Sequence, residues 1–201
     1  MTRLGMARGG STAAAGRWLA LAVAALLSLT GLASPAAAEH PTAFMQRVAN
    51  DLVTAARSNN PALFAAAIRR HADVPSLGLA SLGSYAGRMP KQDRPAYFNG
   101  MIKFMANYAS KEAPKYPVAR ATVLGATDES AGGVGVDSRL ELRDGTTYDI
   151  RWHLVRRGDG WKVRDAQVLG FWMSPFMQRL FENYISENGG NPQALILALN
   201  R

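Results

Sequence analysis

The 201-residue sequence contains no cysteine. A disulfide framework, thiol chemistry and lipid attachment through cysteine are therefore excluded, so the fold must be stabilised by buried apolar surface. Histidine is scarce as well: His40, His71 and His153 are far apart, and no pair has the spacing of metal ligands. A glycine-rich phosphate loop before a helix and a serine nucleophile elbow are also missing. The sequence thus offers no motif typical of an enzyme or a metal site.

The N-terminal segment has the three-part layout of a secretory signal peptide. Its positively charged residues are Arg3, Arg8 and Arg17. Residues 18–32 are all apolar or small, a run that is short for a membrane-spanning helix, and a small-residue cleavage site follows at 36–38. We therefore expect cleavage after Ala38 and one exported domain over residues 39–201, with an uncleaved N-terminal anchor as the alternative.

The charge of the expected domain is moderate. Removing the three arginines of the signal peptide, which has no acidic residue, lowers the formal net charge from +8 to +5. The remaining basic residues are scattered along the chain, which is not the pattern of a nucleic-acid-binding protein. No later run is long and apolar enough to span a bilayer, so we expect a soluble product.

Helical spacing of apolar residues dominates the first part of the domain. This spacing predicts helices over 41–57, from 61 to about 71, and over 90–110, with short helical pieces over 74–87. In the helix over 90–110 the apolar arc is unusually wide, so more than one neighbouring element must cover it.

Beyond Pro117 the apolar residues alternate with period two. The pattern predicts four consecutive antiparallel strands, over about 118–127, 133–142, 146–156 and 161–170. One face of the middle strands is apolar and the other is polar. In the last strand the apolar residues change from one face to the other, which indicates a bulge near Asp165 that bends the sheet. Helical spacing returns after Ser174 and again over 194–199. This order predicts an α+β domain with a curved antiparallel four-stranded sheet packed against helices.

Carboxylates on the predicted strands are the remaining candidates for acid–base chemistry. They are Asp137, Glu141, Asp149 and Asp165. The first three fall on the polar face beside Arg139 and Arg151, which is typical of solvated ion pairs. Asp165 could face the interior, although a structural role in a turn or bulge explains it as well. We assign no catalytic residue, and the apolar surplus of the sequence either fills a core or lines a cavity.

The later part of the sequence resembles the MlaC family, the periplasmic toluene-tolerance type. The features that carry the resemblance are the strand 149–154, the string Trp161-Lys162-Val163-Arg164-Asp165 with Gly170 five positions on, the amphipathic helix 176–185, and Gly189-Gly190 followed by Leu195-Ile196. The resemblance is specific from about Tyr148 onward and looser upstream.

The resemblance implies a nuclear-transport-factor-like fold with an apolar cavity that holds phospholipid acyl chains as cargo, without a cofactor. It also implies a periplasmic carrier that is not an integral membrane protein. Such a carrier shuttles lipid between an inner-membrane ABC transporter, with its substrate-binding ring, and an outer-membrane lipoprotein complex. The related HpnM branch, associated with hopanoid biosynthesis, is also similar, which leaves a hopanoid-type lipid as alternative cargo.

Side chains expected to contact lipid come from the long helix, the apolar sheet face and the segment beyond the sheet. They are Phe98, Ile102, Met105, Val136, Leu140, Ile150, Trp152, Leu154, Trp172, Phe176 and Leu180. Two other hypotheses stay open. One is a small enzyme on the same fold, with Asp165 or Asp137 as the base and an apolar substrate, for which a cavity carboxylate with a raised pKa would be the mark. The other is a protein-interaction module with a filled core.

Overall fold

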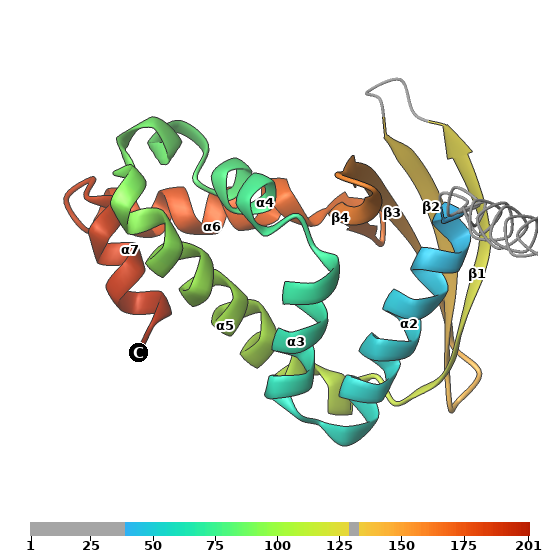
Figure 1. The fold of residues 1–201 in the computed structure, drawn as a ribbon. Coiled ribbons are helices and arrows are strands. Elements are labelled where there is room, and N and C mark those ends of the chain that lie inside the picture. The colour runs from blue at the N-terminus through green and yellow to red at the C-terminus, as the bar shows by residue number, and fades with distance from the viewer. Residues whose placement is uncertain (1–38, 129–132) are drawn as a thin grey trace, which may run out of the picture. The chain divides into compact units, whose positions relative to one another are not determined.

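A computed structural model of the chain describes residues 39–128 and 133–201 (Figure 1). The predicted signal peptide lies outside the described residues. The helices of the described part are α2 (Pro41–Ser58), α3 (Pro61–His71), α4 (Val74–Ser81), α5 (Arg94–Glu112), α6 (Met173–Glu187) and α7 (Pro192–Leu199), with 3-10 turns η1 (Gly83–Arg88), η2 (Lys91–Asp93) and η3 (Ala113–Lys115). The strands are β1 (Val118–Asp128), β2 (Val134–Leu142), β3 (Thr147–Arg157), β4 (Gly160–Val168) and β5 (Phe171–Trp172).

Side-chain caps fix where several helices begin. The side chain of Asn60 accepts a hydrogen bond from the backbone N–H of Ala62 at 2.9 Å, and Asn191 caps α7 in the same way. A proline follows each cap at the start of the helix, where its missing N–H and fixed φ cost nothing. The predicted helix start at Pro61 is therefore confirmed.

The sheet has five strands rather than the predicted four. Its order is β1-β2-β3-β4-β5, and every neighbouring pair is antiparallel. The additional strand, β5, turns back onto β4 through Leu169 and Gly170, whose φ angles are 52° and 81°. A strand of two residues cannot show period-two alternation, so the sequence pattern gave no sign of it. The predicted combination of helices with an antiparallel sheet is confirmed.

The outer face of the sheet carries the predicted polar residues as cross-strand ion pairs. Arg139 donates to Asp149 at 2.7 Å, and Arg151 donates to Asp137 at 3.1 Å. The hydrogen bond from Arg139 lowers the pKa of Asp149 below its ordinary value. Because these pairs are largely exposed to water, each contributes little to stability. They keep one face of the sheet wet and leave the other face for the helices.

A bulge in β4 sets which of its side chains face the helices. His153 pairs with Asp165, but the next residue of β3, Leu154, pairs with Val163, so Arg164 has no partner in the register. The bulge predicted near Asp165 is thus confirmed. It places Ala166 opposite Trp152 and Val168 opposite Ile150, so apolar side chains continue along the inner face beyond the irregularity.

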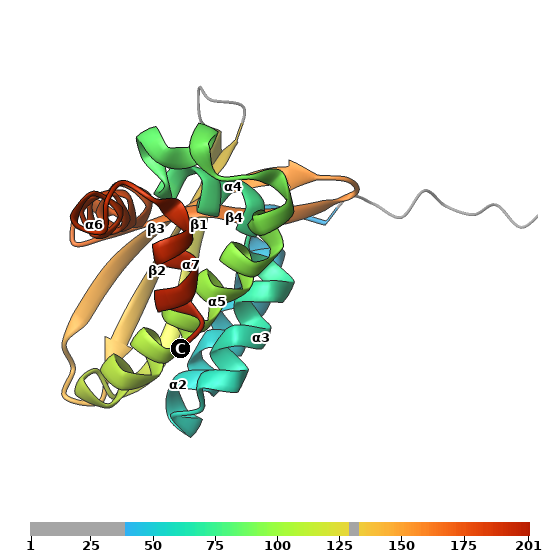
Figure 2. The same ribbon diagram turned by 90° about the vertical axis from the view of Figure 1, so that its left-hand side faces the viewer.

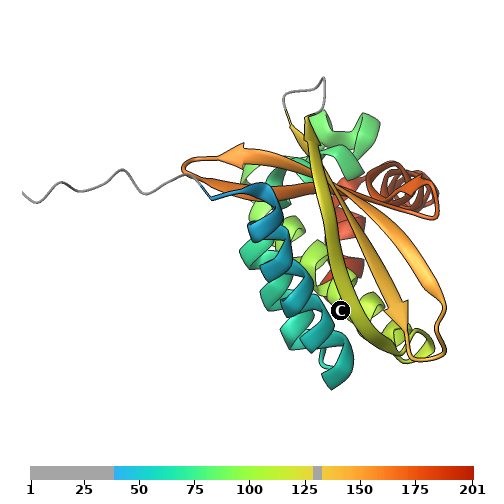
Figure 3. The ribbon, with the colours of Figure 1, turned by 90° about the vertical axis from the view of Figure 1, so that its right-hand side faces the viewer.

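The helices lie on the inner side of the sheet and pack on one another. The helix α2 packs on β1, α3 packs on α2, and α5 packs on α3, as the side-by-side placement of α2 and α3 in Figure 2 shows. From the end of the sheet, α6 runs past α4 to α7 (Figure 1), and the view from the sheet side in Figure 3 shows the twisted strands in front of these helices. Within the described residues, no helix is long and apolar enough to cross a bilayer.

Two apolar cores result from this arrangement. The helical core, formed by α4, α5, α6 and α7, includes Leu82, Tyr97, Met101, Phe181, Ile185 and Leu195. The sheet core, formed by α2 and the inner sheet face, includes Phe44, Met45, Val48, Val136, Leu154 and Trp161. A smaller cluster of Ala55, Phe64 and Ala106 joins α2, α3 and α5.

Candidate functional site

Two adjoining hollows lie where side chains of the helices and the sheet do not close against each other. The first hollow, about 630 Å³, is bounded by α2, α3, α5, β4 and α6. The second hollow, about 450 Å³, lies between α2, α5 and the inner face of the sheet. Both are lined by Leu52, Phe64, Tyr108, Ala109 and Trp152. The two hollows therefore adjoin, and together we call them the slot.

The walls of the slot are almost entirely hydrocarbon and aromatic. On α5, Phe104, Met105 and Tyr108 form the wall from the wide apolar arc seen in the sequence. Small side chains explain why the space is not filled: Ala67, Ala72, Ala109 and Ala166 all line the first hollow from different elements. Ligand sites in proteins commonly span about 300–1,000 Å³, so the slot is large enough for a sizeable apolar molecule.

The slot opens to solvent along an apolar rim. Phe176 and Leu180, on the first half of α6, are 45% and 43% exposed although they line the first hollow. Leu169, in the turn before β5, is 67% exposed and lines the second hollow. Exposed apolar side chains grouped around an opening are typical of a binding site rather than of an ordinary surface.

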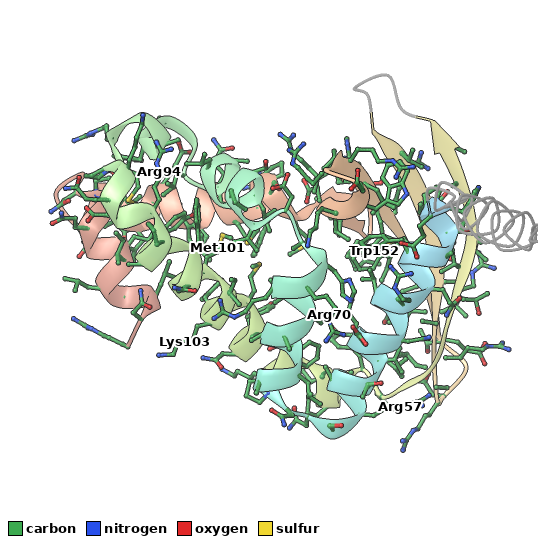
Figure 4. The ribbon with its side chains drawn as sticks, in the orientation of Figure 1. Arg57, Arg70, Arg94, Met101, Lys103 and Trp152 are labelled. Atoms are coloured by element: carbon green, nitrogen blue, oxygen red, sulfur yellow. The ribbon has the colours of Figure 1, made fainter. Side chains whose placement is uncertain are left out.

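Six of the residues predicted to contact lipid line the slot. Met105, Phe176 and Leu180 line the first hollow, Leu140 and Ile150 line the second, and Trp152 lines both. Figure 4 shows Trp152 at the sheet, on the side of the helices. Contact of these side chains with lipid remains a prediction.

The other five predicted residues line neither hollow. Phe98 and Ile102 pack in the helical core, because the first half of α5 faces α4 and α7 instead of the sheet. Val136 and Leu154 are fully buried in the sheet core beneath α2. Trp172 lies in β5, half-buried, and lines neither hollow.

The contribution of α2 and α3 to the slot was not among the predicted positions. Val48, Leu52, Phe64 and Ile68 line it, yet each belongs to a regular amphipathic stripe that looks the same when it faces a filled core. Phe104 and Tyr108 could have been predicted from the sequence. They make the apolar arc of α5 wider than a single neighbouring element can cover.

His71 and Trp152 on the slot wall are tied to partners within the protein. The buried His71 places Nε2 2.7 Å from Asp51 Oδ2, and Arg70 donates to the same oxygen at 3.1 Å. The hydrogen bond to His71 and the charges of His71 and Arg70 lower the pKa of Asp51, against the opposing effect of burial. On the sheet, Trp152 Nε1 donates to the hydroxyl of Ser138 at 2.8 Å. These groups shape the wall instead of presenting free hydrogen-bonding atoms to a ligand.

The two carboxylates considered as catalytic bases have structural partners. Oδ1 of Asp165 accepts hydrogen bonds from the backbone N–H of Ala166 at 2.8 Å and of Ser174 at 3.1 Å, which ties the bulge to the start of α6. Asp137 pairs with Arg151 on the outer face of the sheet, away from the slot. Across residues 39–128 and 133–201 no group of three potential metal ligands occurs. Both carboxylates are therefore held by partners within the protein.

Comparisons with known proteins agree with the fold. A solved structure of a phospholipid-binding protein from Ralstonia solanacearum, in complex with a phospholipid, superposes with a TM-score of 0.66 at 17% sequence identity, covering 81% of this chain and 96% of that chain. At this identity the likeness shows the fold. No curated protein matches the sequence. The family model described as MlaC protein matches residues 42–201. The chain therefore belongs to the MlaC family.

Proposed function

We propose that this protein is a lipid carrier that holds phospholipid acyl chains in the slot. The observation that carries the proposal is the pair of adjoining open hollows with hydrocarbon walls between two well-packed cores. Membership of the MlaC family supports it, as does the phospholipid in the structure of the Ralstonia solanacearum protein. No catalytic step is part of the proposal.

The composition of the walls suits reversible transport. Each buried methylene group contributes about 0.8 kcal/mol, so one acyl chain of about 16 carbons would lose on the order of 10 kcal/mol on exposure to water. A carrier has to offer an environment close to that of the bilayer, since much tighter binding would prevent release. Smooth apolar walls with few free hydrogen-bonding groups meet this condition.

We propose that the carrier works in the periplasm after removal of residues 1–38. The charged, apolar and small-residue regions of that segment support export and cleavage near Ala38. The cargo would then pass between an inner-membrane ABC transporter, with its substrate-binding ring, and an outer-membrane lipoprotein complex. A hopanoid-type lipid is the alternative cargo, since a rigid polycyclic hydrocarbon would also suit apolar walls.

Lipid analysis of the purified protein tests the proposal. We expect organic extraction of protein exported by a bacterial host, followed by mass spectrometry, to yield close to one lipid molecule per chain or more. Phospholipid would support the main proposal and a hopanoid the alternative. Absence of any co-purifying lipid, together with no uptake from phospholipid vesicles, would refute both.

A charge placed in the slot provides a second test. Ile150→Asp puts a carboxylate on the wall of the second hollow, and we expect the variant to fold but to retain less than about one tenth of the lipid, because an unpaired charge is costly in apolar surroundings. The matched control is Leu197→Asp, since Leu197 is 66% exposed on α7 and lines neither hollow. Full lipid retention by a folded Ile150→Asp variant would contradict the proposal.

A further inference from the structure

The two hollows of the slot differ in the polar groups at their edges. The second hollow is lined by Tyr116, Tyr148 and Glu112, and Glu112 is the last residue of α5. In the first hollow, His71 and Asp165 already have partners within the protein, and the other charged side chain on the lining, Arg164, is exposed to solvent. An amphipathic ligand would therefore find its hydrocarbon end matched by the first hollow and its polar end by the second.

A cation lies at the polar edge of the second hollow. Lys115 Nζ is 2.9 Å and 2.8 Å from the two carboxylate oxygens of Glu112, which itself lines the hollow. The Lys115 side chain is 61% exposed and that of Glu112 only 26%. Glu112 thus holds the ammonium group at the boundary between the slot and solvent.

The surroundings keep this cation charged and leave it able to bind a further group. The hydrogen bond and charge of Glu112 raise the pKa of Lys115, with smaller contributions from Tyr116 and Tyr108. An ammonium group has three donors, and the carboxylate oxygens of Glu112 accept at most two of them in the described structure. One donor therefore remains available for an anion.

We propose that Lys115 binds the phosphate of the lipid headgroup, so that the lipid lies in the slot with its polar end at the end of α5. The inference rests on the proposed function. The acyl chains then extend past Trp152, which lines both hollows, into the first hollow. Glu112 is a positioning residue, which directs Lys115 and does not itself contact the phosphate.

The test compares two lipids with the same acyl chains, phosphatidylglycerol and diacylglycerol, since only the first has a phosphate. Retention of each is measured after uptake from mixed vesicles. We expect Lys115→Ala to lower retention of phosphatidylglycerol by up to about fivefold, the size of one solvent-exposed ion pair, without changing retention of diacylglycerol. Lys115→Arg should restore most of the loss, because it keeps the charge.

Two control variants make the outcome specific. Lys111→Ala removes an exposed cation from the last turn of α5 that lines neither hollow, and it should change neither retention. Arg164→Ala removes the exposed cation of the β4 bulge, at the first hollow. A selective loss of phosphatidylglycerol in Arg164→Ala, and not in Lys115→Ala, would overturn the proposed orientation. An unchanged ratio of the two lipids in Lys115→Ala would overturn the role of Lys115.

Further outcomes separate this inference from the proposed function. If the unchanged protein takes up neither lipid, the carrier proposal itself fails. If it takes up both and Lys115→Ala changes nothing, only the headgroup site fails. Calorimetric titration with inorganic phosphate distinguishes a lipid headgroup from free phosphate as the ligand, because Lys115-dependent binding without acyl chains would contradict the assignment to a lipid.

Discussion

The helical core and the slot share two helices, α5 and α6, but one is filled with side chains and the other is open. In the first half of α5, Tyr97 and Met101 have no exposed surface, whereas Tyr108 in the second half is 53% exposed. In α6 the order is reversed: Leu180 lies on the open rim and Ile185 is fully buried. Figure 4 shows Met101 among the helices and Trp152 at the sheet. Each of the two helices thus has buried side chains toward one end and exposed apolar side chains toward the other.

Small residues have opposite effects in the two regions. In the helical core, glycine permits close packing: a Cβ atom at Gly78 would lie 2.8 Å from the ring of Phe98, and one at Gly100 would lie 2.8 Å from Leu199 Cβ. Around the slot, alanines such as Ala67 and Ala109 face a space that no larger side chain fills. Small residues therefore allow close packing where two elements approach each other. Where no neighbouring side chain reaches them, they leave a hollow.

The largest expected difference is in stability, between truncation of a core side chain of α6 and truncation of a side chain of α6 on the open rim. We expect Ile185→Ala to lower the free energy of unfolding by about 2–5 kcal/mol, because it creates a cavity in a filled core. Leu180→Ala, on the open rim, should cost less than about 1 kcal/mol. Urea unfolding of lipid-free protein measures both, since bound lipid would stabilise the folded state. Equal losses would mean that the rim is packed as tightly as the core.

Two alanines one turn apart on α5 should respond differently when each is replaced by a larger side chain. Ala106 is 2% exposed in the cluster that joins α2, α3 and α5, so we expect Ala106→Phe to destabilise the protein by about 1–3 kcal/mol through overpacking. Ala109 lines both hollows, so Ala109→Phe should leave stability unchanged and sharply reduce lipid retention. Normal lipid retention by Ala109→Phe would contradict the position of the slot.

The smallest expected effect is a loss of stability in acid. It should arise at Asp51, whose carboxylate pairs with His71 on the slot wall. Its pKa in the folded protein is lowered from 3.8, so the ionised carboxylate contributes stability above that pH and loses it as the pH falls through the folded pKa. Because the side chain of Asp51 is 37% exposed, the contribution is reduced by solvent. Unfolding measured between about pH 5 and pH 2 should show a shallower decline for Asp51→Asn than for the unchanged protein. Parallel pH curves would exclude this role.

Most of the fold could be predicted because its signals are local. The helix and strand periodicities, the cap at Asn60 and the parity change near Asp165 each depend on a few neighbouring residues. The positions on the slot wall could not be predicted in the same way. Phe98 and Phe104 belong to the same apolar arc of α5, and only the placement of other elements decides that the first packs on the helical core and the second lines the slot. Periodicity shows that a side chain is covered, without showing what covers it.

The bulge at Arg164 keeps apolar side chains on the slot side of β4 beyond Val163. If β4 paired with β3 without the bulge and kept Arg164, strict alternation from Trp161 and Val163 would turn Asp165 and Gln167 toward the slot, and Ala166 and Val168 toward water. This part of the slot wall would then exchange hydrocarbon for carboxylate and amide although no residue had changed identity. Relatives of the same length that lack the bulge should therefore be compared by the direction of their side chains as well as by their aligned letters.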